Sequence, residues 1–422
     1  MVNGEPETEL VGCTGAYPST VAVPGSAACD GQIERMNLFR RLARDYKWPP
    51  YPLARLHFVV FSVLILALAL TLVAPTNASA ATPAATLESV LDQASVLAPL
   101  ETVIVARNGQ VVAERGYRGH TTTAPTNIKS ASKLVISALV GIAIDKGVLE
   151  GTDQPIAPLL TQDLPARLDS RLQRVTIGHL LSMQAGLGST SGSGYGAWVG
   201  SRNWVQAALA RPFEDEPGGR MIYSTGSTHL LSAILTRQSG RSTLQLARDW
   251  LGPLDGFQIT GWTRDPQGIY MGGNEMAMSP RSLLAFGELY RRGGVTPAGE
   301  RLIPGEWIDA SWRLRTRSPW TGDGHGYAWF LTRIAGEDVR YGWGYGGQML
   351  YLVPRLGLTV VMTSNEGASA AQSGHRNALH QLLGRIITAA AQADHALGAA
   401  SLNRVSRNAW TSAHERRSAS SW

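Results

Sequence analysis

The chain has 422 residues, of which 44% are apolar, so it is long enough for one large domain or two ordinary ones with a substantial core. Its formal charge is +6, but aromatic residues make up only 7% and the basic residues form no dense run, which argues against a nucleic-acid-binding protein. Arginine outnumbers lysine 34 to 4, and beyond residue 80 only Lys129, Lys133 and Lys146 remain, so each lysine there calls for a reason.

The first predicted segment is a leader over residues 1–80. The stretch 56–74 is almost entirely apolar, follows several basic residues and precedes Ala78-Ser79-Ala80, a layout typical of a secretory signal with an A-x-A cleavage site. An uncleaved membrane anchor is the alternative, because the run approaches the roughly 20 residues that span a bilayer. We therefore expect a periplasmic or secreted protein, with the signal at about residues 36–80 and membrane contact only through that segment.

Both cysteines, Cys13 and Cys29, lie in the leader. The exported part would then contain no disulfide and no cysteine-ligated metal, and its stability must come from packing.

The exported part begins with a short helical run after residue 85. Two alternating runs, 102–106 and 110–114, are joined by Asn108-Gly109, which predicts a β-hairpin. Residues 129–146 then follow a helical pattern that is apolar around most of its circumference and stops at Gly147, as expected of a buried helix.

The rest of the chain returns from helix to strand. Residues 150–315 mix Gly/Pro/Ser-rich loops with four helical runs, 178–183, 203–210, 228–238 and 280–292. Strand character returns at 326–334, 348–353 and 358–363, and a helix follows near 375–397. Strands near both ends with helices between them predict an α/β (α+β) fold, in which helices flank one antiparallel sheet. We expect an α/β domain from 86–120 and 318–398, an inserted mainly helical domain over 121–317, and a polar tail over 399–422.

The strongest chemical signal is Ser130-Ala131-Ser132-Lys133 at the start of the buried helix. Residues three apart share a helix face, so the Ser130 hydroxyl and the Lys133 amine can meet. Serine needs an adjacent base to become a nucleophile, and burial lowers a lysine pKa enough to supply one. A chance match with an outward-pointing lysine is the alternative, but lysines are scarce here.

Two further stretches fit the same chemistry. Tyr223, in Tyr223-Ser224-Thr225 before a helical run, could pass protons between nucleophile and leaving group, although buried structural tyrosines are commoner. Residues 342–348 (GWGYGGQ) open a strand, and an N–H there could join that of Ser130 in an oxyanion hole. The residue that offers this N–H is either Tyr345 or Gln348.

Other site types find little support. Residues 342–348 also match G-x-G-x-x-G, but a dinucleotide fingerprint follows a strand and opens a helix. The chain has no G-x-S-x-G elbow and no H-E-x-x-H, and its histidines lack ligand spacing. We expect no metal and no cofactor.

These elements, in this order, resemble the serine β-lactamase and penicillin-binding-protein superfamily, particularly its class C and esterase-like branch. Residues 175–187 and 278–283 resemble further family stretches, and the likeness runs from about residue 95 to 390. The resemblance implies an antiparallel sheet with a helical domain and the site between them. It also implies Ser130 as nucleophile, Lys133 as base, Tyr223 as proton shuttle, and a substrate-binding edge made by Tyr345, Gly346, Gly347 and Gln348.

Two departures from the family's lactamases affect the expected substrate. Thr225 stands where they have an asparagine, and Tyr345-Gly346-Gly347 replaces Lys/His-Thr/Ser-Gly, which removes a cation that would pair with a substrate carboxylate. The Gly-Tyr-Gly-Gly-Gln edge is similar to that of 6-aminohexanoate-dimer hydrolases and carboxylesterases.

We therefore expect a hydrolase of small-molecule esters or linear amides. A β-lactamase, or a penicillin-binding DD-peptidase or sensor, is the alternative. The predicted substrate-binding residues are Thr225, Tyr195, Trp198 and Asn274, although tryptophans in such a segment more often belong to a core.

Overall fold

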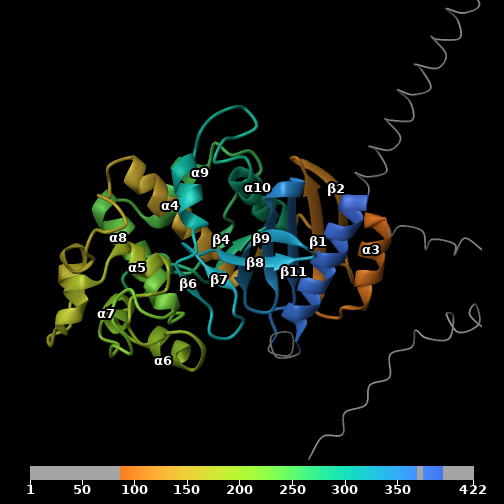
Figure 1. Ribbon diagram of the computed structural model, residues 1–422. Coiled ribbons are helices and arrows are strands. Elements are labelled where there is room, and N and C mark those ends of the chain that lie inside the picture. Colours follow the sequence, from red (N-terminus) through yellow and green to blue (C-terminus); the bar gives the residue numbers. More distant parts are fainter. Residues whose placement is uncertain (1–85, 368–373, 393–422) are drawn as a thin grey trace, which may run out of the picture. The chain divides into compact units, whose positions relative to one another are not determined.

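A computed structural model describes residues 86–367 and 374–392 (Figure 1). The predicted leader, its cleavage site and the predicted tail lie outside the described residues. Within the described part, no helix is both long enough and apolar enough to cross a membrane. The described residues belong to one compact unit, and the predicted division into two domains stays a prediction.

The described residues form one large antiparallel sheet, as the sequence predicted. Its eight strands follow the order β2-β1-β11-β10-β9-β8-β7-β6, so strands from both ends of the described chain lie side by side (Figure 1). A second sheet has the order β3-β5-β4. The strands are β1 (Leu100–Arg107), β2 (Gln110–Gly116), β3 (Thr126–Asn127), β4 (Gly261–Trp262), β5 (Met276–Met278), β6 (Thr316–Arg317), β7 (Gly324–His325), β8 (Phe330–Ile334), β9 (Glu337–Gly344), β10 (Gln348–Val353) and β11 (Leu358–Ser364).

Helices cover both faces of the large sheet. The described α-helices are α3 (Leu87–Gln93), α4 (Lys133–Asp145), α5 (Ile177–Leu181), α6 (Tyr195–Val199), α7 (Trp204–Leu209), α8 (Thr225–Ser239), α9 (Thr243–Leu251), α10 (Pro280–Arg291) and α11 (Gly305–Ser311). Residues 375–392 form a further helix, called the C-terminal helix below. Short 3-10 helices are η1 (Ala94–Val96), η2 (Lys129–Ser132), η3 (Ala157–Asp163), η4 (Ser170–Arg174), η5 (Gly192–Gly194) and η6 (Pro354–Leu356).

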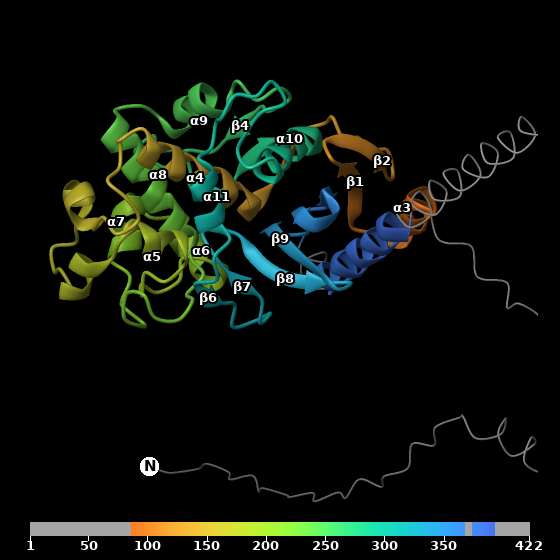
Figure 2. The same cartoon turned by 45° about the horizontal axis from the view of Figure 1, so that its top comes forward.

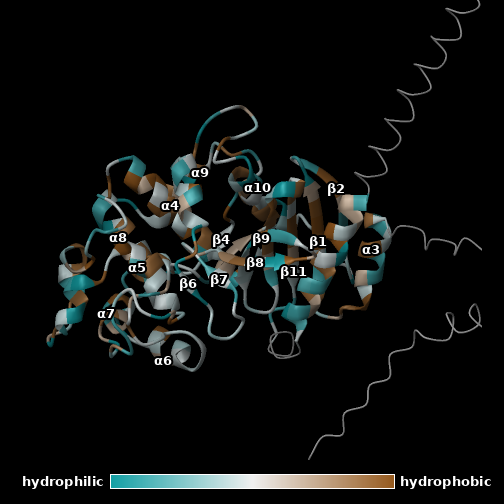
Figure 3. Cartoon of the chain, in the orientation of Figure 1, coloured by the Kyte–Doolittle hydropathy of each residue, from teal (hydrophilic) through white to brown (hydrophobic). Residues whose placement is uncertain are grey.

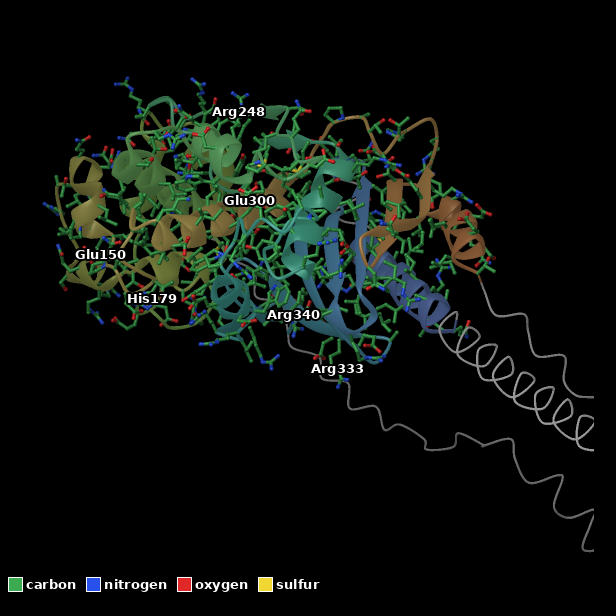
Figure 4. All side chains as sticks on the ribbon, turned by 90° about the horizontal axis from the view of Figure 1, so that it is seen from above. Glu150, His179, Arg248, Glu300, Arg333 and Arg340 are labelled. Atoms are coloured by element: carbon green, nitrogen blue, oxygen red, sulfur yellow. The ribbon has the colours of Figure 1, made fainter. Side chains whose placement is uncertain are left out.

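Every residue of β10 and β11 is buried, because the sheet is packed on both sides. On one face, α3 and the C-terminal helix lie together and bury residues such as Leu91 and Leu383 against Val360 (Figure 2). On the other face, the core that contains α4, α8 and α10 includes Leu350 and Val361. In Figure 3, brown marks hydrophobic residues on strands of this sheet. Figure 4 shows that exposed charged side chains, such as those of Glu150 and Arg333, lie around the outside.

The predicted hairpin is confirmed. Strands β1 and β2 pair across Asn108 and Gly109, whose φ angles of 49° and 89° lie in the left-handed region that this turn requires. The predicted helix over 129–146 is also present, although its first turn is the 3-10 helix η2 and α4 begins at Lys133.

Two strand predictions need correction. The run 326–334 is too long, because β8 begins only at Phe330 and Ala328 has a φ of 68°, outside the extended region. Residues 342–348 do not simply open a strand: they end β9, turn through residues 345–347 and begin β10. The glycines are explained by this turn, since Gly346 and Gly347 have φ angles of 84° and 110°.

Strand β9 lies close against the start of α4. A β-carbon at Gly342 would overlap the Leu134 side chain, and one at Gly344 would overlap the carbonyl oxygen of Ile128. Glycine at these two positions therefore lets the sheet approach η2, the turn that carries Ser130.

Candidate active site

Ser130 and Lys133 meet as their spacing predicted. Ser130 lies in η2 and remains partly exposed, whereas Lys133, the first residue of α4, is only 2% exposed. The Lys133 Nζ donates a hydrogen bond to the Ser130 Oγ at 3.1 Å. A hydroxyl and an amine in this arrangement can act as a nucleophile and its base.

The surroundings of Lys133 favour its neutral form. Its Nζ contacts three uncharged oxygens: the Ser130 Oγ, the Thr225 Oγ1 at 3.2 Å and the Gly273 carbonyl oxygen at 2.6 Å. Burial lowers the pKa of Lys133 from 10.5 to about 7. A substantial fraction of the amine is therefore unprotonated at neutral pH, as a general base must be.

Gly273 is a part of the site that was not predicted from the sequence. Its φ is 88°, and a β-carbon there would lie 2.6 Å from the Lys133 Cγ and would overlap the Thr228 hydroxyl. Only a glycine fits this position, from which the carbonyl reaches the Lys133 amine. The Gly272-Gly273 pair in the sequence indicated that another part of the chain could approach the backbone closely here.

Tyr223 lies next to the same pair of residues. The Lys133 Nζ is 5.1 Å from the centroid of its ring. Burial raises the pKa of the Tyr223 hydroxyl to about 12, and a hydrogen bond with the Ser130 side chain opposes this rise. The phenol therefore keeps its proton at neutral pH and can donate it.

A cavity of about 700 Å³ opens beside Ser130. Its volume suits a small-molecule ligand. Aromatic side chains line much of it, together with hydroxyls and one carboxylate. The lining residues are Lys129, Ser130, Ser189, Ser191, Gly192, Tyr195, Tyr223, Thr225, Asn274, Glu275, Ser318, Trp320, Phe330, Trp343 and Tyr345.

Three of the four predicted substrate-binding residues line this cavity. The Thr225 hydroxyl is bonded to Lys133 and lies 3.0 Å from the Ser191 Oγ. The Asn274 Nδ2 donates to the Tyr195 hydroxyl at 2.9 Å, while the Asn274 Oδ1 is buried and has no hydrogen-bond partner among the described residues.

Trp198 does not line the cavity. It is 3% exposed and packs with Trp204 and Met271, and its Nε1 donates to the Trp204 carbonyl oxygen at 2.9 Å. Its indole N–H is hydrogen-bonded and its ring is packed inside the protein. Trp198 is therefore a core residue, and its prediction as a substrate-binding residue is corrected.

Only one residue of the predicted substrate edge lines the cavity, namely Tyr345, which is 48% exposed. Gly346 and Gly347 form the turn between β9 and β10 and are not among the lining residues. Gln348 is fully buried, and its Nε2 donates to the Ser364 carbonyl oxygen at 2.5 Å. The side-chain amide of Gln348 thus joins the start of β10 to the end of β11, and it does not line the cavity.

Several lining residues were not predicted from the sequence. Lys129 and Glu275 are the charged ones, and the rarity of lysine was a signal for the first. Trp320, which is 71% exposed and lies edge-on to the Tyr223 ring at 6.5 Å between centroids, gave no periodic signal because it sits in a loop.

Comparisons with known proteins agree with this geometry. A family model described as beta-lactamase matches residues 101–385. The chain is 23% identical over 290 residues to a 6-aminohexanoate-dimer hydrolase of Paenarthrobacter ureafaciens, covering 63% of this chain and 72% of the relative.

Solved structures share the fold at low sequence identity. A beta-lactamase/D-alanine carboxypeptidase from Yersinia pestis has a TM-score of 0.56 and 17% identity, with 71% of this chain and 98% of that chain covered. EstCE1, described as a hydrolase with promiscuous acyltransferase activity, has a TM-score of 0.58 and 18% identity, covering 71% of this chain and 95% of the other.

Proposed function

The chain belongs to the beta-lactamase family and is a serine hydrolase, and from this premise we propose that it cleaves small esters or linear amides through an acyl-enzyme on Ser130. The observation that carries the proposal is the 3.1 Å contact between the Ser130 Oγ and the buried Lys133 Nζ. The lowered pKa of this amine, about 7, supports its role as base.

The proposed acylation step uses three side chains. Neutral Lys133 takes the hydroxyl proton as the Ser130 Oγ bonds to the substrate carbonyl carbon. Tyr223 gives its proton to the departing alcohol or amine and is reprotonated from Lys133. Water then attacks the ester on Ser130, with the same groups returning the proton to Oγ.

An oxyanion hole completes the proposal. We assign its two donors to the backbone N–H groups of Ser130 and Tyr345, because Tyr345 lines the cavity and Gln348 is buried away from it.

The substrate class follows from the polarity of the cavity. Its aromatic lining suits an apolar acyl or leaving group, and the Thr225 hydroxyl is already engaged with Lys133 and Ser191. The name of the 6-aminohexanoate-dimer hydrolase relative describes a linear amide substrate. We therefore rank small esters and linear amides above β-lactams and above peptides whose terminal carboxylate lies close to the scissile bond.

Hydrolysis of p-nitrophenyl butyrate by purified variants tests the mechanism. Ser130→Ala and Lys133→Ala are each expected to lower kcat at least about 1,000-fold, because such residues act as a unit. Intact-mass measurement after brief exposure to the ester is expected to find a butyryl group on the wild type and none on Ser130→Ala. Undiminished turnover by Ser130→Ala would refute the proposal. Nitrocefin and a labelled penicillin, run alongside, separate lactamase and sensor activity from it.

We also propose that the protein is exported, with residues 36–80 as its signal or anchor. Intact mass of the protein recovered from its producing cells distinguishes a chain cut after Ala80 from one that keeps the segment. Recovery of the full chain in the cytosolic fraction alone would contradict export.

A further inference from the structure

Lys129 places a cation beside Ser130, but that cation is already paired with two carboxylates. Its side chain lines the cavity and is 16% exposed, and its Nζ lies 2.7 Å from a Glu366 carboxylate oxygen and 3.4 Å from a Glu275 carboxylate oxygen. Two carboxylates thus share one ammonium group at the wall of the site.

The backbone and a neighbouring amide hold this arrangement in place. Lys129 has a φ of 49°, and its N–H donates to the Asn127 Oδ1 at 2.9 Å. The Asn127 Nδ2 donates in turn to the second Glu275 oxygen at 2.7 Å. Glu275 is therefore fixed by two donors, and it holds the ammonium group in a defined position.

The charge balance at this wall disfavours anions. Lys129 and Glu275 are the charged residues among those that line the cavity, and Glu366 adds a second negative charge just outside it. A substrate carboxylate that approaches Lys129 would have to displace a carboxylate from it or lie beside two like charges. In a partly buried site such repulsion is weakly screened.

We propose that Glu275 and Glu366 determine the substrate specificity of this site, by occupying Lys129 and so excluding substrates that carry a carboxylate close to the scissile bond. The inference rests on the proposed function, because it concerns the substrate of the same Ser130 site. It predicts that the chain contains a latent carboxylate-binding residue, which removal of the two glutamates would release.

A matched pair of esters tests this. Methyl 3-(butyryloxy)benzoate and 3-(butyryloxy)benzoic acid give the same butyryl-enzyme, and their leaving phenols differ in charge and by one methyl group. Comparing their ratio between variants cancels the difference in intrinsic reactivity. The wild type is expected to prefer the methyl ester at least tenfold in kcat/KM. In the double variant Glu275→Gln/Glu366→Gln, this preference is expected to shrink at least tenfold, through a lower KM for the acid, and the shift is expected to weaken as salt is added.

Two further variants make the result decisive. Adding Lys129→Met to the double variant is expected to abolish the gain, because the freed ammonium group is then gone. Glu366→Gln alone, at a side chain 42% exposed, is expected to give part of the shift even if the double variant folds poorly. The preference ratio cancels any general loss of activity.

An unchanged ratio in Glu366→Gln and in the folded double variant would overturn the inference, as would a gain that survives Lys129→Met. Failure of the proposed function is recognised separately, because Ser130→Ala would then still hydrolyse the methyl ester.

Discussion

Lys133 must lose its proton before it can act as a base, so its pKa governs the response of the reaction to pH. Burial lowers this pKa from 10.5 to about 7. The protonated form dominates below that value and cannot accept the Ser130 proton. We expect kcat/KM for a neutral ester to rise about tenfold per pH unit below about 7 and to level off above it. A pH profile with p-nitrophenyl butyrate that stays flat down to pH 5 would contradict this role.

Tyr223 is expected to matter most when the leaving group is poor. Its pKa of about 12 keeps it protonated at neutral pH, and a departing alkoxide needs a proton far more than p-nitrophenolate does. Tyr223→Phe is therefore expected to lower kcat for ethyl butyrate about 100-fold and kcat for p-nitrophenyl butyrate less than about tenfold. Equal losses on both esters would indicate a structural role instead.

At this scale the sequence was most informative where contacts are local. Ser130 and Lys133 lie three residues apart, so helix geometry alone brings them together. The Gly273 carbonyl reaches Lys133 from 140 residues away, and Glu275 reaches Lys129 from 146 residues away. No spacing rule connects residues so distant, and these contacts could only be found in the folded structure.

Helix α8 supports the site through a buried polar face. Thr225, Thr228, His229 and Ser232 are spaced three and four residues apart, and all are buried. The Thr228 hydroxyl donates to the Gly272 carbonyl oxygen at 3.0 Å, and the Ser232 hydroxyl donates to the Tyr270 carbonyl oxygen at 2.7 Å. This face therefore fixes the segment whose Gly273 carbonyl contacts Lys133.

His229 ties the same helix to a buried carboxylate. Its Nε2 lies 3.0 Å from an Asp265 carboxylate oxygen, and its Nδ1 accepts from the Gly272 N–H at 3.4 Å. His229→Ala leaves both groups without this partner and is expected to cost about 1–3 kcal/mol of stability.

The same variant is expected to shift the pH midpoint of kcat/KM, because the acceptor of Lys133 moves with Gly272. Chemical denaturation and a pH profile measure the two effects, with Gln238→Ala on the exposed side of α8 as control. A stability loss with an unmoved pH midpoint would restrict His229 to a purely structural part.

Elements were predictable from sequence where periodicity was clean, as in the hairpin at Asn108-Gly109 and the buried helix α4. Prediction was poorer at turns. Glycines in residues 342–348 fit a ligand-binding strand and a hairpin equally well in the sequence, and only the pairing of Gln348 with Gly344 decides between them. Likewise, Trp198 could not be assigned to core or cavity until its neighbours Trp204 and Met271 were known.

At the scale of the molecule, one hydrophobic core joins the helices to the sheet. Leu139 of α4, Leu231 of α8 and Leu350 of β10 all belong to it. We expect the helical part and the sheet to unfold together, in one cooperative transition. Far-ultraviolet circular dichroism and tryptophan fluorescence should then give the same denaturation midpoint for the full chain. Two separated midpoints would favour the two independent domains predicted from the sequence.

Strand β1 finds its partner β11 at the other end of the described chain, and the Thr102 and Thr363 hydroxyls meet there at 2.6 Å although they are 261 residues apart. During synthesis, β1 leaves the ribosome long before β11 exists, so the middle of the sheet cannot close until β11 has been made. Until then the edges of β1 and β10 that β11 will cover have no partner, and they can pair wrongly with each other or with another chain.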